Sequence, residues 1–364
     1  MNFFARRRYR KVIHHLVHEG RHLVNMRGDI LPPASLEELA ARERDLLAAW
    51  AQRDEKMILK EIEVFSAWLE KLNPPRTHPK LREYVEVVVV AVAVAMAFRT
   101  YFIQPFKIPT GSMQPTLYGI TVQTQYAPTL MDRFPLNIVP WILFGEHYSE
   151  VKAKVAGRVD PRYLTEDESI VFFVNGIPHP ILRDMTLFFS LGDYVAKGQV
   201  MASGRVRHGD HIFVDKLRYN FCRPKRGDIS VFGTDNIHYP RIRPNSFYIK
   251  RLVGLPGEEV AVQPPYLVIN GQRVTEPYPF KRLLEEKDKG YVGYTMAREQ
   301  PDAEVYLGKN GSPRKLGKEQ FLMLGDNTEN SYDGRYFGPI RQEDLVGPAF
   351  MVYWPITKRW GRTR

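Results

Sequence analysis

A run of twelve uncharged residues, 87–98 (VVVVAVAVAMAF), separates two parts of the chain that differ in character. Before the run, apolar residues recur mostly every three, four or seven positions, which is the period of an amphipathic helix. After Gln104-Pro105, short β-type runs alternate with Gly, Pro, Asn and Asp. The sequence therefore predicts a helical region, one apolar helix and a mainly β domain, in that order.

The length of the apolar helix decides whether it is buried or spans a membrane. Twelve residues are fewer than the roughly 20 that cross a bilayer, and this favours a buried helix. Extended to residues 84–103, the segment reaches full length, with Glu86 and Arg99 near its ends. Both side chains lie close enough to the interfaces to reach water, and Tyr84 and Tyr101 suit the aromatic belts. We therefore expect a transmembrane helix over residues 84–103.

Basic residues just before this helix predict its orientation. Arg76, Lys80 and Arg82 place the N-terminus in the cytoplasm by the positive-inside rule. The expected protein is single-pass in the cytoplasmic (inner) membrane. Residues 1–75 form a cytoplasmic helical region, and residues 104–364 form an extracytoplasmic β-rich domain.

The overall charge also bears on partners. A formal net charge of +11 favours an anionic surface, but the basic residues are scattered and no nucleic-acid-reading motif occurs. A phospholipid membrane is therefore the expected anionic partner, and nucleic acid is not. The single cysteine, Cys222, allows no intramolecular disulfide, so the fold must rest on packing. The sequence leaves the oligomeric state open.

Two residues carry candidate chemistry. Thr110-Gly111-Ser112 forms a turn in which the Ser112 N–H and the Thr110 hydroxyl are expected to converge as oxyanion donors. Lys250 lies in a strand-like segment, and burial of its face would lower its pKa toward that of a general base. A serine and a neutral lysine are the minimum equipment of a Ser/Lys acyl-transfer enzyme. Taken alone, an ordinary turn serine and a solvent-facing lysine remain open as alternatives.

A third polar element covers residues 325–338. Asp326, Glu329 and Asp333 have a spacing similar to that of a Ca²⁺ loop, but Ser331 and Phe337 stand where the EF-hand requires Gly and Glu. Calcium is therefore not expected at this loop.

Four separated blocks, in this order, resemble the type I bacterial signal peptidases, the Ser/Lys leader peptidase family that removes signal peptides from translocated proteins. The blocks are residues 108–117, 209–216, 248–257 and 325–338. Any one block would be a weak signal, whereas four in order are specific. The resemblance implies an antiparallel, signal-peptidase-like β domain, with insertions at about 118–206 and 263–320.

The same resemblance implies roles for individual residues. Ser112 would be the nucleophile, Lys250 the general base, and Thr110 a donor to the oxyanion. Three residues would support this pair: Ser331 would orient the lysine, and Asp333 and Arg335 would form an ion pair. Shallow S1 and S3 pockets suited to Ala-x-Ala cleavage sites would be lined by Phe106, Ile108, Met113, Leu117, Tyr248 and Ile249.

The resulting prediction is a membrane-bound serine endopeptidase that removes N-terminal signal peptides from secreted preproteins through an acyl-enzyme, with no metal or cofactor. Its partners would be those signal peptides and the phospholipid membrane. Two alternatives stay open. One is a specialised Ser/Lys maturation protease of the same fold, and the other is a non-catalytic, membrane-anchored interaction protein.

Overall fold

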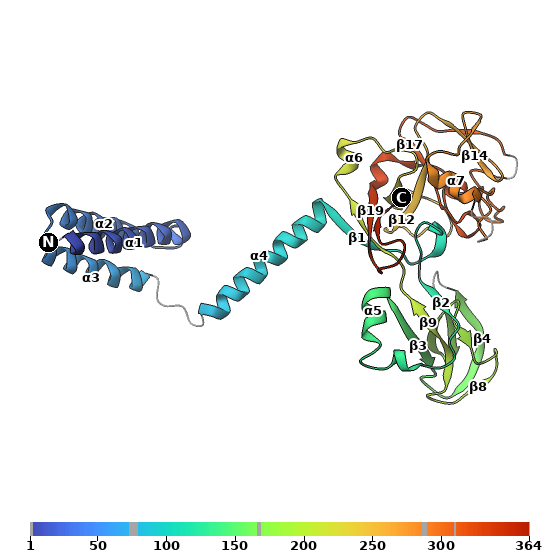
Figure 1. Cartoon of the computed structure of the whole chain (residues 1–364), viewed down its shortest axis with the longest axis horizontal. Helices are drawn as coiled ribbons and strands as arrows, with labels where there is room; N and C mark the ends of the chain where they lie inside the picture. Colours follow the sequence, from blue (N-terminus) through green and yellow to red (C-terminus); the bar gives the residue numbers. More distant parts are fainter. Residues whose placement is uncertain (1–2, 73–78, 166–168, 286–289, 309–310, 364) are drawn as a thin grey trace. The chain divides into compact units, whose positions relative to one another are not determined.

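The computed structural model describes residues 3–72, 79–165, 169–285, 290–308 and 311–363 (Figure 1). It forms two compact units, Met1–Val92 and Ala93–Arg364, and the boundary between them falls within helix α4 (Pro79–Tyr101). Arg76, which contributed to the predicted orientation, lies outside the described residues. The domain boundaries drawn from the sequence stay predictions.

The first unit packs three long helices against one another. They are α1 (Phe3–Arg27), α2 (Pro33–Gln52) and α3 (Glu55–Leu72). Their apolar residues, spaced at the helical period, meet in a common core of Ile13, Leu16, Leu23, Leu39, Leu46, Ala49, Ile58, Phe65 and Leu69. Polar contacts cross the rim of this core, including the Tyr9 hydroxyl donating to Glu55 at 3.1 Å and the Arg21–Glu43 ion pair at 2.9 Å.

Helix α4 contains the apolar run, and here the sequence prediction was wrong. Among the described residues, none of the helices combines the length and apolar character needed to cross a membrane. The expectation of a transmembrane helix over residues 84–103 is therefore wrong, and the single-pass topology that rested on it is not supported. The physical reason is the short uncharged part of α4, residues 87–98, which Glu86 and Arg99 bound on either side.

The second unit is built on antiparallel sheets, in agreement with the mainly β fold expected there. Its largest sheet has the strand order β1-β10-β19-β11-β12-β17-β18, and β20 pairs with β19. These strands are β1 (Ile103–Lys107), β10 (His211–Asp215), β11 (Ile229–Gly233), β12 (Phe247–Gly254), β17 (Gln320–Leu324), β18 (Ile340–Arg341), β19 (Leu345–Trp354) and β20 (Gly361–Arg362).

The described residues between 118 and 207 include the strands of two smaller sheets with their own apolar core. One sheet contains β2 (Thr121–Gln123), β3 (Glu146–Lys152), β7 (Thr186–Leu187) and β9 (Val200–Arg207). The other contains β4 (Gly157–Thr165), β5 (Ser169–Val174), β6 (Ile177–Leu182) and β8 (Tyr194–Val195). Helix α5 (Ile138–Phe144) precedes β3.

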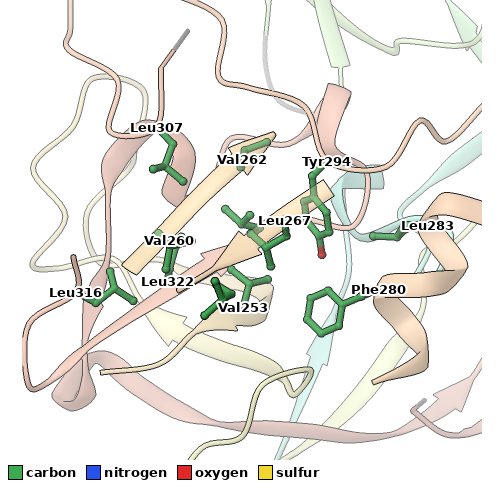
Figure 2. Close-up of a cluster of buried hydrophobic side chains, with 12 residues drawn as sticks. Val253, Val260, Val262, Leu267, Phe280, Leu283, Tyr294, Leu307, Leu316 and Leu322 are labelled. Atoms are coloured by element: carbon green, nitrogen blue, oxygen red, sulfur yellow. The ribbon is translucent and has the colours of Figure 1, made fainter. Parts of the chain in front are cut away.

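A fourth sheet follows β12 and anchors it. Its strands are β13 (Glu259–Gln263), β14 (Tyr266–Ile269), β15 (Gln272–Arg273) and β16 (Arg314–Lys315). Figure 2 shows how Val253 of β12 and Leu322 of β17 pack with Val260 and Leu267 of this sheet and with Phe280 of helix α7 (Tyr278–Glu285). This buried cluster packs against Val253, near the C-terminal end of the strand that carries Lys250. The same strand is hydrogen-bonded to β11 on one edge and to β17 on the other.

Short helical segments complete the second unit. They are η1 (Gly111–Met113), η2 (Leu130–Asp132), α6 (Arg218–Phe221), η4 (Thr328–Asn330), α8 (Gly334–Phe337) and η5 (Gln342–Asp344).

Candidate active site

Segments far apart in the sequence meet at Ser112. This residue lies in η1, shortly after strand β1, and Lys250 lies in the middle of β12. The Lys250 Nζ donates a hydrogen bond to the Ser112 Oγ at 2.6 Å, and the two residues are only 5% and 7% exposed. A neutral amine at this distance can accept the serine proton.

The surroundings of Lys250 favour its neutral form. Burial lowers the pKa of Lys250 to about 8, because the ammonium group loses its hydration. The negative charge of Asp333 raises the pKa of Lys250, the positive charge of Arg335 lowers this pKa, and the negative charge of Asp326 raises it. A pKa of about 8 makes a substantial fraction of the amine neutral near physiological pH, whereas an ordinary lysine stays almost fully protonated there.

The residue after the lysine forms a separate buried ion pair. Arg251 is 0% exposed and donates to both carboxylate oxygens of Asp326, with Nε to Oδ1 at 2.8 Å and Nη2 to Oδ2 at 2.6 Å. The Thr116 hydroxyl accepts from Arg251 at 3.1 Å and donates to Asp326 at 2.5 Å. Sequence reasoning missed this triad, although an arginine inside an apolar strand signals a buried partner.

The loop after β17 is braced by a second ion pair. Asp333 and Arg335 are both fully buried, and Arg335 Nε lies 2.9 Å from Asp333 Oδ1. Burial alone would raise the pKa of Asp333, but the Arg335 guanidinium and the Gly325 N–H hold this pKa below its usual value. Asp333 therefore stays ionised and accepts the Gly325 N–H at 2.9 Å.

This loop also holds the backbone of the serine turn. The Asn327 N–H donates to the Ser112 carbonyl oxygen at 3.0 Å, and its side-chain amide donates to the Gly111 carbonyl oxygen at 3.1 Å. Asn327 was not singled out from the sequence, because nothing local predicts a contact with a turn more than 200 residues away.

Two of the sequence-predicted polar residues stand apart from the hydrogen-bonded pair. Within the described part of the chain, the buried Ser331 Oγ has no hydrogen-bond partner, so the expected bond to Lys250 is not formed in this structure. Thr110 lies exposed at the start of η1, with φ −104° and ψ 161°. Its hydroxyl is therefore open to an incoming substrate.

The six predicted pocket residues divide between two apolar clusters. Phe106 and Ile249 pack, half-buried, on a cluster that includes the deeply buried Ile108, Met113 and Leu117. The side chains of Ile108, Met113 and Leu117 are buried in this cluster, whereas those of Phe106 and Ile249 are partly exposed at its edge. The sixth residue does not join them.

Tyr248 instead packs against a neighbouring cluster. Its ring centroid lies 6.3 Å from that of Phe232, in a group that also includes Leu252 and Met323. The structure thus brings five of the six predicted pocket residues together around the segment that carries Ser112.

Comparison with known proteins places this chain in a family. A family model described as "Signal peptidase, peptidase S26" matches residues 81–140 and 181–354, more than half of the chain. The Signal peptidase I of Leptolyngbya laminosa is 33% identical over 150 residues, covering 41% of this chain and 62% of the relative. The Probable signal peptidase I-2 of Synechocystis sp. is 33% identical over the same length, covering 57% of the relative.

Two further similar proteins differ in how much of their own length this chain matches. Signal peptidase IB of Staphylococcus aureus is 28% identical over 170 residues, covering 47% of this chain and 81% of the relative. A crystal structure of a signal peptidase I from Enterococcus faecalis is 27% identical and covers 35% of this chain and 96% of that chain, with a TM-score of 0.25. The chain thus spans 62% and 57% of the first two relatives. By the extent of the family match, this chain belongs to the signal peptidase family, peptidase S26.

Proposed function

We propose that this protein is a serine endopeptidase that removes signal peptides from translocated preproteins, with Ser112 as nucleophile and Lys250 as general base. The observation that carries the proposal is the buried 2.6 Å hydrogen bond between Lys250 Nζ and Ser112 Oγ. Membership of the family and relatives named Signal peptidase I support the substrate class. Action at the cytoplasmic membrane, on its extracytoplasmic face, is part of the same proposal.

In the proposed reaction, neutral Lys250 takes the Ser112 proton while Oγ attacks the scissile carbonyl carbon. The Ser112 N–H and the Thr110 hydroxyl stabilise the resulting oxyanion. The lysine then gives its proton to the leaving amine, which leaves an acyl-enzyme on Ser112. A water molecule, deprotonated by Lys250, attacks this ester, and the returned proton regenerates Ser112.

The buried acidic residues have a defined part in this cycle. Lys250 becomes an ammonium group each time it accepts a proton, and burial disfavours that state. The ionised Asp333 stabilises it electrostatically, as its upward influence on the lysine pKa indicates. The opposing effects leave the lysine basic enough to accept a proton and neutral enough to start the reaction.

The pH dependence of cleavage tests this assignment. Only neutral Lys250 can act as the base, so kcat/KM is expected to rise about tenfold per pH unit well below its pKa and to level off above about 8. The measurement is the initial rate of cleavage of a preprotein with an Ala-x-Ala site from pH 6 to 10, with Ser112→Ala as the blank at each pH.

A rate independent of pH between 6 and 9, or equal cleavage by Ser112→Ala, would contradict the Ser/Lys assignment. Activity confined to other cleavage sites, with the same pH profile, would favour the specialised maturation protease. A well-folded wild type that cleaves nothing would favour the interaction protein.

Gly325 gives a second test, because it has no room for a side chain. A Cβ at this position would lie 2.1 Å from the Ser331 Oγ and 2.7 Å from the Ser112 carbonyl oxygen. Gly325→Ala should therefore shift the serine turn and lower kcat about 100-fold, the scale of a misplaced reacting group. In Gly233→Ala, the matched control on β11, the nearest atom would lie 3.5 Å away, and near-normal kcat is expected. Equal kcat in Gly325→Ala and Gly233→Ala would show that a side chain at position 325 does not displace the serine turn.

A further inference from the structure

A pocket with a volume of about 420 Å³ lies in the second unit, and neither Ser112 nor Lys250 lines it. Its walls come from residues 115–117, which follow the serine turn, from Arg282 of α7, from Val352 of β19 and from the C-terminal segment 358–363. Residues distant in sequence thus enclose a space large enough for a small organic ligand.

The lining of this pocket is strongly cationic. None of the described residues that line it is acidic. Its four charged side chains are all basic, and they belong to Arg282, Lys358, Arg359 and Arg362. Such a concentration of one sign of charge costs electrostatic energy in an empty pocket and favours an anionic ligand.

Two of these cations are already engaged in holding the pocket together. Arg359 donates to both oxygens of Asp210, at 2.8 and 2.9 Å, and its guanidinium lies 4.1 Å from the centroid of the Tyr118 ring. Arg282 donates to the Pro115 carbonyl oxygen at 2.9 Å. These contacts tie α7 and the C-terminal segment to Pro115 and Tyr118, which follow the serine turn, and to Asp210.

The other two cations are available to a ligand. Lys358 and Arg362 make no ion pair with any described residue of the chain, and both side chains are exposed. A guanidinium fork can bind two oxygens of a phosphate at once, and an ammonium group adds a point charge to a third. This combination suits a phosphate group better than a single carboxylate.

The remaining walls are apolar. Trp360 is 51% exposed, and Leu117 and Val352, which also line the pocket, are buried. An indole face beside a cationic site can cover an organic group attached to the anion. An apolar lining of this kind therefore favours an ester of phosphate over the free inorganic ion.

We propose that this pocket binds a phosphate ester, with Lys358 and Arg362 on the phosphate oxygens and Trp360 against the organic group. A soluble phosphate ester and the head group of an anionic phospholipid share this chemistry. The proposal does not depend on the peptidase reaction, because none of Lys358, Trp360 and Arg362 is assigned a role in catalysis or in substrate binding.

The test is calorimetric titration of the full chain with glycerol 1-phosphate and, separately, with inorganic phosphate. We expect saturable binding of the ester at one site and about tenfold weaker binding in Lys358→Gln and in Arg362→Gln, the effect of losing one charge-assisted contact. Lys197→Gln and Arg158→Gln, which remove exposed cations outside the pocket, are the matched controls and should bind as wild type. Trp360→Ala should weaken binding of the ester and leave that of inorganic phosphate unchanged.

The source of the ligand is resolved by competition. Phosphatidylglycerol vesicles that displace glycerol 1-phosphate, where phosphatidylcholine vesicles do not, would identify a lipid head group. Failure of both vesicles to compete would identify a soluble ester. Absence of saturable binding, or equal weakening in pocket and control variants, would overturn the proposal. Ser112→Ala should bind as wild type, so this result stands apart from any failure of cleavage.

Discussion

Replacing Lys250 by Met is expected to lower the rate of preprotein cleavage by at least about 10³-fold at pH 8, within the range for loss of a positioned general base. Methionine is unbranched and flexible enough to fill the same buried space, but it cannot accept the Ser112 proton. Lys250→Arg should be equally inactive, because a guanidinium keeps its proton at any accessible pH. Single-turnover cleavage by purified full-length protein measures both variants. An Arg variant with more than a tenth of the wild-type rate would show that charge, and not proton transfer, is what the position supplies.

Lys250→Met should also change how the free energy of unfolding depends on pH, and measuring this change shows that the variant is folded. Below pH 8 the lysine is protonated in both the folded and the unfolded protein, so the folded state bears the full cost of burying the charge. Between pH 8 and its ordinary pKa of 10.5, only the unfolded state keeps the proton, and the wild type gains stability by about 3 kcal/mol. Lys250→Met should therefore be the more stable protein at pH 7, and this advantage should fade by pH 10.5. Denaturant unfolding across this range measures the difference.

The largest loss of stability is expected from Asp326→Ala. This change leaves the fully buried Arg251 without its carboxylate, and an uncompensated buried charge costs about 3–5 kcal/mol. The free energy of unfolding in urea is the measurement. The double variant Arg251→Met/Asp326→Leu removes both charges and should recover most of the loss.

An exposed ion pair gives the matched control for this experiment. Arg341 and Glu343 lie 3.2 Å apart with side chains 70% and 63% exposed, so Glu343→Ala should cost less than about 1 kcal/mol. Comparable losses for Asp326→Ala and Glu343→Ala would mean that water reaches Arg251.

The sequence predicted the β fold of the second unit better than it predicted the site. Alternating apolar runs between turn residues are local signals, and they mark strands such as β12 and β14 directly. The contact between Ser112 and Lys250 joins positions 138 residues apart, and no local pattern encodes it. A serine in a tight turn and a lysine in a strand suggested the pair, the four ordered blocks supported it, and the catalytic roles of both residues stay predictions.

Other features of the molecule show where such reasoning ends. Arg251 signals a buried partner by its place in an apolar strand, but the strand alone cannot identify Asp326. Residues 118–206 were hard to interpret from the sequence, and their described strands pair in two separate sheets whose partners no local pattern identifies. For α4, apolar composition favoured a membrane span, whereas the charges at both ends of residues 87–98 limit its uncharged length.

The opposite placement of two neighbouring cations on β12 limits how the sequence of this strand can change. Hydrogen bonding on both sides fixes the strand, with Lys250 opposite Ser230 and Arg251 opposite Leu324. A one-residue shift in the register of β12 would turn every side chain of the strand to the opposite face, so that the Arg251 guanidinium would point toward Ser112 and the Lys250 amine toward Asp326. An insertion or deletion that shifts this register would therefore separate Lys250 from Ser112 in one step. Protein engineers who recombine segments of this fold should therefore place every crossover outside β12.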